Sequence, residues 1–105
     1  DELNGIIKGN SVIINCTSLG MTSDFSPVDK FLLNENQIII DTIYNPLKTK
    51  LIIDAEIVGS KTMTGLDMFI YQALASIDLW FGESISERVD FSALRKYLVH
   101  VLSSA

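Results

Sequence analysis

The sequence predicts an α/β fold, in which short parallel strands alternate with helices, and three observations support this class. Two runs of β-branched residues, at 11–17 (SVIINCT) and 37–44 (QIIIDTIY), are typical of buried strands. Apolar residues recur at helical spacing in 50–58 and in 65–81. Of the 105 residues, 48% are hydrophobic, which is enough for one domain with a core. Strands that alternate with helices favour a parallel sheet with right-handed crossovers.

The first half of the chain is expected to hold two of the strands. Residues 1–10 are polar apart from one Ile-Ile pair, and we interpret them as the end of a helix or as a loop. The strand at 11–17 leads into a loop that contains glycine and proline and carries one short helical turn at 28–33. Polar residues then separate this turn from the second strand.

The segment after the second strand is expected to form a helix and a third strand. Thr49 can cap a helix over 50–58, and Gly59 suits the left-handed conformation that follows a last helical turn. The five residues at 60–64 (SKTMT) are expected to form the third, short strand.

The remaining residues are expected to be helical. Gly65 opens a long helix and Gly82 closes it, while the tail offers two further helix starts. Residues 84–87 have capping-box spacing, and Asp90 is a separate N-cap candidate. The fold class is therefore half of a doubly wound (Rossmann-like) parallel sheet, with about three strands and flanking helices.

The long helix lacks a polar side. One broad apolar face carries Leu66, Phe69, Ile70, Ala73, Leu74, Ile77, Trp80 and Phe81. The opposite face carries Met68, Tyr71, Gln72, Ala75 and Leu79, so we expect this helix to be covered on both sides. Because burying an unpaired amide costs about 1–3 kcal/mol, Gln72 requires either a structural hydrogen bond or a ligand.

Charge and composition exclude several classes of function. The formal net charge is −5, which argues against a nucleic-acid or anionic-membrane partner, since these bind basic surfaces. Cys16 is the single cysteine, so no disulfide can form within the chain and a cytoplasmic location is favoured. Apolar runs stay well short of the roughly 18 residues of a membrane span. No cluster has the ligand spacing of a metal site, so we expect no metal.

Three segments rich in small polar residues or glycine follow the three strands, at 15–21 (NCTSLGM), 41–46 (DTIYNP) and 62–65 (TMTG). Ligands of open parallel sheets bind beyond the carboxyl ends of the strands, so the convergence of these segments indicates a binding site. Loops of the same composition also occur in proteins that bind nothing there. The glycine-rich dinucleotide fingerprint and the phosphate-binding loop are absent.

Single residues in these segments allow more than one interpretation. Tyr44, held by the following Asn-Pro pair, fits either a core tyrosine or a ligand contact. Cys16 is interpreted as a small buried hydrophobe. Asp41 is interpreted as a strand-end residue bonded to backbone rather than as a functional acid. His100 is interpreted as a solvated side chain near the carboxyl end of a helix.

Three motifs in this order, INCTSLGM, IIIDTIYNPLKTKLI and GLDMFIYQALASIDLWFG, resemble the carboxyl-terminal part of shikimate dehydrogenase. The usual forms in that family are N-[AT]-T-x-x-G-M, D-x-x-Y-x-P-x-x-T-x-L and N-G-L-x-M-L-x-x-Q-[AG]. Order and spacing agree across 13–82. One departure is Thr64, where the third motif usually has asparagine.

The resemblance implies a role for seven residues in binding. Asn15, Thr17 and Ser18 would lie along the nicotinamide cofactor, and Thr42 and Gly65 would meet its nicotinamide end. Tyr44 would bind the substrate near its carboxylate, and Gln72 would bind a substrate hydroxyl. The implied reaction is reversible hydride transfer between 3-dehydroshikimate and NADPH, with NAD as a possible cofactor.

The resemblance also implies that these residues are a fragment, the carboxyl-terminal half of an NADP-binding domain with terminal helices. The family's substrate domain, with its catalytic Lys and Asp, is not in this sequence, so the fragment alone is expected to be inactive and to contain no catalytic residue. We expect it to self-associate through the exposed face of the long helix. The alternatives are a quinate/shikimate dehydrogenase that uses NAD, and a non-catalytic binding or oligomerisation module.

Overall fold

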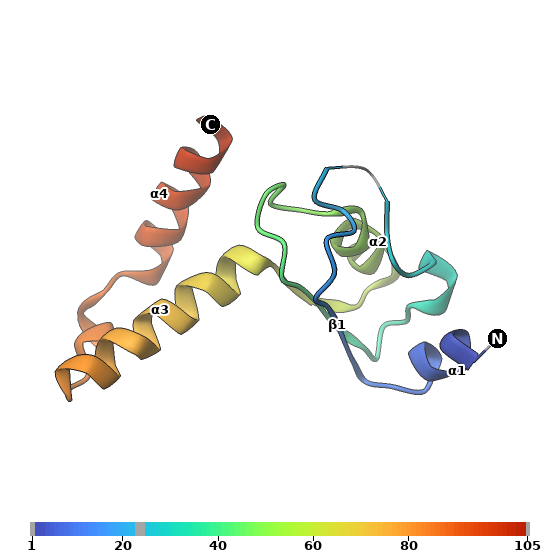
Figure 1. Ribbon diagram of the computed structural model, residues 1–105, viewed down its shortest axis with the longest axis horizontal. Coiled ribbons are helices and arrows are strands. Elements are labelled where there is room, and N and C mark those ends of the chain that lie inside the picture. The colour runs from blue at the N-terminus through green and yellow to red at the C-terminus, as the bar shows by residue number, and fades with distance from the viewer. Residues whose placement is uncertain (1, 23–24, 105) are drawn as a thin grey trace. The chain divides into compact units, whose positions relative to one another are not determined.

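The computed structural model describes residues 2–22 and 25–104 (Figure 1). The chain divides into two compact units, Asp1–Gly65 and Leu66–Ala105. The first unit contains the sheet, and the second contains helices.

The sheet has three parallel strands, β1 (Val12–Asn15), β2 (Ile38–Asp41) and β3 (Lys61–Met63), in the order β1-β2-β3. The prediction of three parallel strands is therefore confirmed. The register of β1 and β2 places Asn15 opposite Asp41, the last residue of each strand. Each strand is shorter than its predicted range.

Both of the first two strands end in the same kind of turn. The Thr17 N–H donates to Asn15 Oδ1 at 3.0 Å, and the Ile43 N–H donates to Asp41 Oδ1 at 3.0 Å. A side chain that bonds the backbone two residues later turns the chain out of the extended conformation. The segments at 15–21 and 41–46 therefore leave the sheet as loops.

The helical segments of the first unit are α1 (Glu2–Lys8), a 3₁₀ turn η1 (Lys30–Leu32) and α2 (Lys50–Val58). The predicted end signals of α2 are confirmed. The Thr49 side chain accepts a hydrogen bond from the backbone of the first turn. Gly59 adopts φ 89° after the last turn, in the left-handed region that favours glycine.

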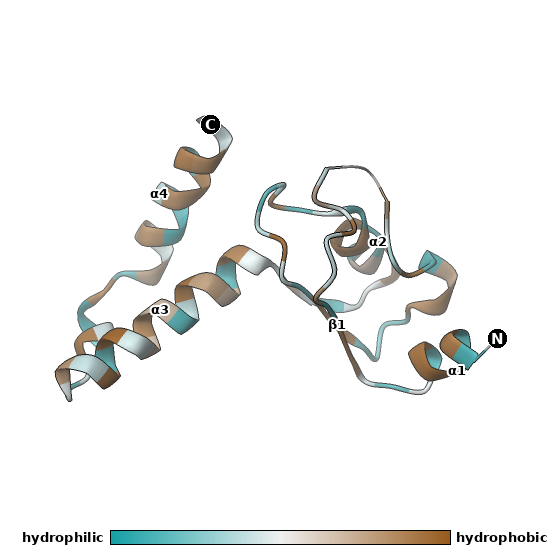
Figure 2. Cartoon of the chain, in the orientation of Figure 1, coloured by the Kyte–Doolittle hydropathy of each residue, from teal (hydrophilic) through white to brown (hydrophobic). Residues whose placement is uncertain are grey.

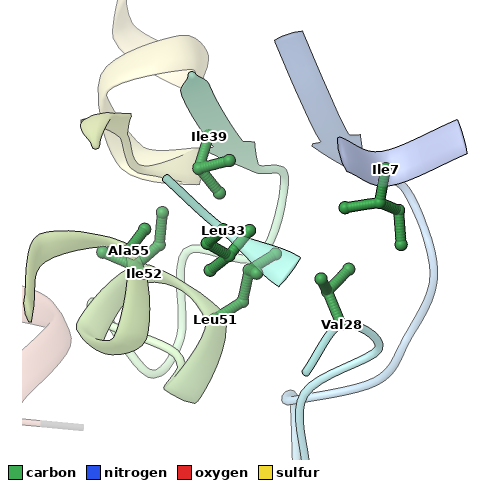
Figure 3. Packing of buried hydrophobic residues seen from close by; sticks show 7 residues of the cluster. All are labelled: Ile7, Val28, Leu33, Ile39, Leu51, Ile52 and Ala55. Atoms are coloured by element: carbon green, nitrogen blue, oxygen red, sulfur yellow. The ribbon is translucent and has the colours of Figure 1, made fainter. Parts of the chain in front are cut away.

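The core of the first unit lies between the sheet and these helical segments. Figure 3 shows seven buried side chains that converge from α1, the long loop, β2 and α2. They are Ile7, Val28, Leu33, Ile39, Leu51, Ile52 and Ala55. The apolar stripe expected on α2 supplies three of them.

A buried glutamine fastens α1 and the loop before β2 to this core. Gln37 is 2% exposed, and its Nε2 donates to Ile7 O at 2.8 Å and to Asn10 O at 3.2 Å. Its Oε1 accepts from the Asn34 N–H at 2.9 Å. Every polar atom of the buried amide is thereby paired, as burial requires.

The second unit consists of α3 (Gly65–Phe81), whose first residue belongs to the first unit, a 3₁₀ turn η2 (Ile85–Arg88) and α4 (Phe91–Ser104). Gly82 ends α3 with φ 68°, as predicted.

Of the two predicted helix starts in the tail, Asp90 is the one that caps α4. Its Oδ1 accepts from the Ala93 N–H at 3.1 Å. Ser84 makes no side-chain cap hydrogen bond. The Ser86 N–H donates to Asp78 at 2.7 Å, and the Glu87 N–H, which a capping box would use, donates to the Ser84 carbonyl at 3.3 Å.

Side-chain contacts join α3 to α4 within the second unit. Arg95 Nε donates to Asp67 at 2.6 Å, and the rings of Tyr71 and Phe91 stack with centroids 4.8 Å apart. Figure 2 shows hydrophobic residues along much of both helices. Leu66 and Ile70 are buried, whereas Phe69, which the sequence placed on the same face, is half exposed.

Candidate functional site

A cavity of about 660 Å³ lies in the first unit, beyond the carboxyl ends of β1 and β2. Its walls are formed by Cys16, Thr17, Ser18, Met21, Thr22, Thr42, Ile43, Tyr44 and Asn45. Apart from Thr22, these residues come from two of the three segments that were expected to converge, 15–21 and 41–46, and the third segment at 62–65 does not line the cavity. The volume lies within the range of about 300–1,000 Å³ found for small-molecule and cofactor sites.

Backbone and hydroxyl groups of Thr42 join the two walls. The Thr42 N–H donates to Asn15 O at 3.1 Å, and Thr42 Oγ1 donates to the same carbonyl at 2.9 Å. This hydroxyl is thus used within the chain. Thr42 lines the cavity, and its implied role at the cofactor stays a prediction.

Asn15 holds the first wall, which we define as the cavity residues of 16–22, through hydrogen bonds to its backbone and side chains. The side chain is 4% exposed, and its Oδ1 accepts from both the N–H and the hydroxyl of Thr17, the latter at 2.6 Å. Its Nδ2 donates to Leu19 O at 3.2 Å and to Asp41. Asn15 does not line the cavity and its amide is engaged on both sides, so its implied contact with a cofactor stays a prediction. Thr17 and Ser18 are exposed on the wall itself.

Asp41 is fully buried between the two walls. Its carboxylate accepts from the Ile43 N–H at 3.0 Å, from Thr49 Oγ1 at 2.7 Å and from Asn15 Nδ2 at 3.2 and 3.3 Å. The interpretation of Asp41 as a strand-end residue bonded to backbone is correct. The sequence did not reveal its two side-chain partners, which come from other elements.

One residue of the wall differs from its expected environment, and a second had two open interpretations. Cys16 was expected to be buried, but it is exposed on the wall, because β1 ends at Asn15 and Cys16 lies in the turn that follows. Tyr44 is 50% exposed and also lines the cavity, so of its two interpretations the ligand contact agrees better with its surroundings.

Gly65 brings the third segment close to the second. A Cβ atom at this position would lie 2.4 Å from Thr42 O and 2.5 Å from Ile43 O. Only glycine permits this approach of two backbones without a shift. Gly65 does not line the cavity. The close packing of the two backbones is by itself a reason for glycine here, and the implied role at the cofactor stays a prediction.

Gln72 lies in α3, in the second unit, and its side chain is exposed. Its Nε2 donates to Phe69 O at 3.0 Å. Of the two alternatives for this amide, the structure shows a local structural hydrogen bond. The argument from burial does not apply to an exposed side chain, so binding by Gln72 stays a prediction. His100 is exposed on α4, as its interpretation requires.

Within residues 2–22 and 25–104, no three acidic, histidine or cysteine side chains are placed so that they could hold a metal ion together. Among the helices of the same residues, none has the length and apolar character to cross a membrane.

No family model matches the chain, but known proteins of similar sequence were found. A shikimate dehydrogenase (NADP(+)) of Thermococcus kodakarensis is 42% identical over 82 residues, which cover 78% of this chain and 30% of that protein. The corresponding protein of Pyrococcus abyssi is 45% identical over 82 residues, covering 78% and 31%. The chain spans about a third of the length of these relatives.

Solved structures show the same similarity. A shikimate dehydrogenase in complex with NADP+ is 40% identical with a TM-score of 0.63, over 72% of this chain and 28% of that one. A chorismate mutase/shikimate 5-dehydrogenase fusion protein from Clostridium acetobutylicum is 33% identical with a TM-score of 0.75, over 94% and 37%. A quinate dehydrogenase from Corynebacterium glutamicum in complex with NAD is 25% identical with a TM-score of 0.75, over 93% and 34%.

These matches confirm the resemblance that the three motifs indicated. This chain is similar in sequence and in fold to part of shikimate dehydrogenases, and its three parallel strands with flanking helices match those structures.

Proposed function

We propose that this chain is the carboxyl-terminal half of the NADP-binding domain, with the terminal helices, of a shikimate dehydrogenase. Such an enzyme reversibly reduces 3-dehydroshikimate to shikimate with NADPH. The observation that carries the proposal is the cavity at the carboxyl ends of β1 and β2, whose walls are built from the first two motifs of the resemblance. Since the relatives are about three times longer, we place the catalytic groups of the enzyme outside these residues.

The cavity suits part of a nicotinamide cofactor, and the names of the relatives favour NADP. Its walls carry the exposed hydroxyl-bearing residues Thr17 and Ser18 and also include Thr42. The nicotinamide ring, when bound, supplies the hydride. We assign Thr17, Ser18 and Thr42 to direct contact with the cofactor, and Asn15 and Gly65 to holding the backbone that meets it.

Substrate binding is assigned to Tyr44 and Gln72. Tyr44 carries its phenol on the cavity wall, half exposed, where a hydroxyl can donate to a carboxylate. The exposed Gln72 amide can donate and accept at the same time, which suits a hydroxyl of shikimate. We further propose a cytoplasmic location, since a chain with one cysteine suits a reducing compartment.

Two alternatives rest on specific observations. The likeness to a quinate dehydrogenase in complex with NAD favours an enzyme that uses NAD with quinate or shikimate. The exposed apolar residues of α3 and α4 favour a module whose role is association with itself or with another protein.

Binding and turnover together test the proposal. NADP+ is titrated into this chain labelled with ¹⁵N, and we expect the amide signals of Thr17, Ser18 and Thr42 to shift before those of α4. The longer polypeptide that contains the chain is then assayed for shikimate oxidation with NADP+ and with NAD+. Faster turnover with NADP+ supports the proposal, and faster turnover of quinate with NAD+ supports the first alternative. Absence of both oxidations, with no shift in the cavity, would leave the non-catalytic module.

A further inference from the structure

Donors from three parts of the chain converge on one buried carboxylate. Asp41 accepts from the Ile43 N–H in the second wall, from the Thr49 hydroxyl at the start of α2, and from Asn15 Nδ2 beneath the first wall. Asp41 is 0% exposed and Thr49 is 3% exposed. The bonds therefore form away from water, where each contributes more and its loss costs more.

The hydrogen bonds continue from Asp41 into the first wall. Asn15, which donates to Asp41, accepts from the N–H and hydroxyl of Thr17. Thr17 Oγ1 in turn accepts from the Leu19 N–H at 3.2 Å, and Asn15 Nδ2 donates to Leu19 O. A continuous series of bonds thus runs from α2 through Asp41 to a loop more than 20 residues earlier in the sequence.

We propose that Asp41 is a positioning residue for the cavity. Its carboxylate holds the wall that contains Thr17 and the wall that contains Ile43 in one fixed arrangement, and thereby sets the affinity for a nicotinamide nucleotide. The part that concerns the nucleotide rests on the proposed function, whereas the part that concerns the walls does not.

The chemistry of the three donors explains why a carboxylate is needed. An ionised carboxylate is acceptor-only and has lone pairs for all of them. An asparagine of the same shape would turn an N–H₂ group toward Asn15 Nδ2 or toward the Ile43 N–H, which are themselves donors. The change Asp41→Asn therefore keeps the size of the side chain and breaks the pattern of bonds.

Amide hydrogen exchange of this chain tests the positioning role. In Asp41→Asn we expect the amides of Thr17, Leu19 and Ile43 to exchange roughly ten- to a hundredfold faster, the range for losing one hydrogen bond to a charged group. The Ile38 N–H donates to Ser11 O at 2.7 Å at the opposite end of the sheet and serves as the reference. We expect its rate to change much less.

A matched control separates positioning from general stability. Asp54 is also buried, at 6% exposed, but its carboxylate is paired with Lys50 at 2.9 Å, which is not a residue of either wall, whereas Asp41 bonds Ile43 and Asn15. In Asp54→Asn we expect any acceleration to be similar at Thr17, Ile43 and Ile38. Equal acceleration of these three amides in Asp41→Asn would overturn the proposal, as would an unchanged rate at Thr17.

A second pair of variants applies if Asp41→Asn does not fold. Thr49→Val keeps the shape of the side chain and removes both its hydrogen bond to Asp41 and its cap on α2, whereas Thr49→Ser keeps the hydroxyl for both; Ile38 again serves as the reference for a general loss of stability. We expect Thr17 and Ile43 to exchange faster in Thr49→Val than in Thr49→Ser. Equal rates in the two variants at Thr17 would contradict coupling through the carboxylate.

Titration with NADP+ tests the second part. We expect Asp41→Asn to raise the Kd for NADP+ about tenfold or more, and Asp54→Asn to leave it unchanged. An unchanged Kd in Asp41→Asn would refute control of affinity. If the unmodified chain binds no NADP+, the proposed function fails for this chain, and the exchange rates still decide whether Asp41 positions the walls.

Discussion

At the scale of the residue, several polar side chains near the cavity form hydrogen bonds within the chain. Asn15, Asp41 and Thr49 bond one another and the adjacent backbone, while Thr17, Ser18 and Tyr44 reach the wall. A motif residue can therefore belong to a binding site without touching the ligand, because its bonds fix the backbone that does.

Tyr44 and Gln72 are the residues whose change tests substrate binding. In the longer polypeptide that contains this chain, Tyr44→Phe removes a donor from the cavity wall and Gln72→Ala removes an exposed amide. We expect either change to lower kcat/KM for shikimate by roughly tenfold or more, the usual effect of one lost hydrogen bond. Steady-state kinetics with both substrates varied measures it. Unchanged kinetics in both variants would remove the two residues from the site.

Gly65 is the residue most sensitive to an added methyl group. In Gly65→Ala the new Cβ would stand 2.4 Å from Thr42 O, so the backbone must shift. We expect the free energy of unfolding to fall by roughly 1–3 kcal/mol, as for other overpacked sites. Denaturant unfolding measures this change in the free energy of unfolding.

Gly5→Ala is the control. Nothing lies within 4 Å of the added atom there, so we expect equal or greater stability. A Gly65→Ala protein as stable as Gly5→Ala would contradict the packing argument.

At the scale of the element, local signals located the ends of the helices well. The caps at Thr49, Gly59 and Asp90 depend on atoms within a few residues, and all three form as expected. The capping box at 84–87 does not form: the Glu87 N–H, which it would use, donates to the Ser84 carbonyl, and Asp78 accepts from the Ser86 N–H. A short motif reveals neither of these competing bonds.

The link between α3 and η2 is expected to depend on pH. Hydrogen bonds from the hydroxyl and the N–H of Ser86 lower the pKa of Asp78 below its usual value of 3.8. A lowered pKa in the folded state stabilises the protein above the unfolded pKa, and this contribution is lost as pH falls through the folded pKa. Ser86→Ala removes the hydroxyl, so its destabilisation relative to wild type should be present at about pH 6 and shrink toward about pH 2. Urea unfolding of both proteins across this range measures the difference. A difference independent of pH would contradict the assignment.

At the scale of the whole molecule, the first unit has a buried core, and both units also expose large apolar side chains, such as Phe31 in the first unit at 85%. In α3, Leu79 is 82% exposed and Trp80 is 76% exposed. Exposed apolar surface of this kind is typical of regions that meet another protein surface. The expected cover of the long helix on both sides is thus not present for these two residues.

We expect this chain to self-associate through α3 at micromolar concentrations. Burial of the exposed apolar residues would supply the free energy. Sedimentation velocity of the chain, compared with Leu79→Glu, measures it, and we expect the charged variant to dissociate. Lys96→Glu in α4 is a control for charge alone, since Lys96 is an exposed polar residue. A monomer at all concentrations, identical to the Leu79→Glu variant, would contradict this prediction.

The sequence by itself determined the elements that depend on near neighbours. The β-branched runs, the helical stripe at 50–58 and the caps predicted three parallel strands and their helices, and the motifs predicted the two walls of the cavity. Propensity, capping and periodicity act over a few residues, so one sequence suffices to recognise them.

The tertiary structure alone decided which of those residues work together. The bond between Asn15 and Asp41 spans 26 residues and exists because β1 and β2 pair in register. The same holds for three other features that depend on which backbones become neighbours: the exposure of Cys16, the hydrogen bonds from Gln37 to Ile7 and Asn10, and the close approach of Gly65 to Thr42. Packing brings distant residues together at distances that spacing along the chain does not encode, and this is why the site's internal bonds appear only in the folded molecule.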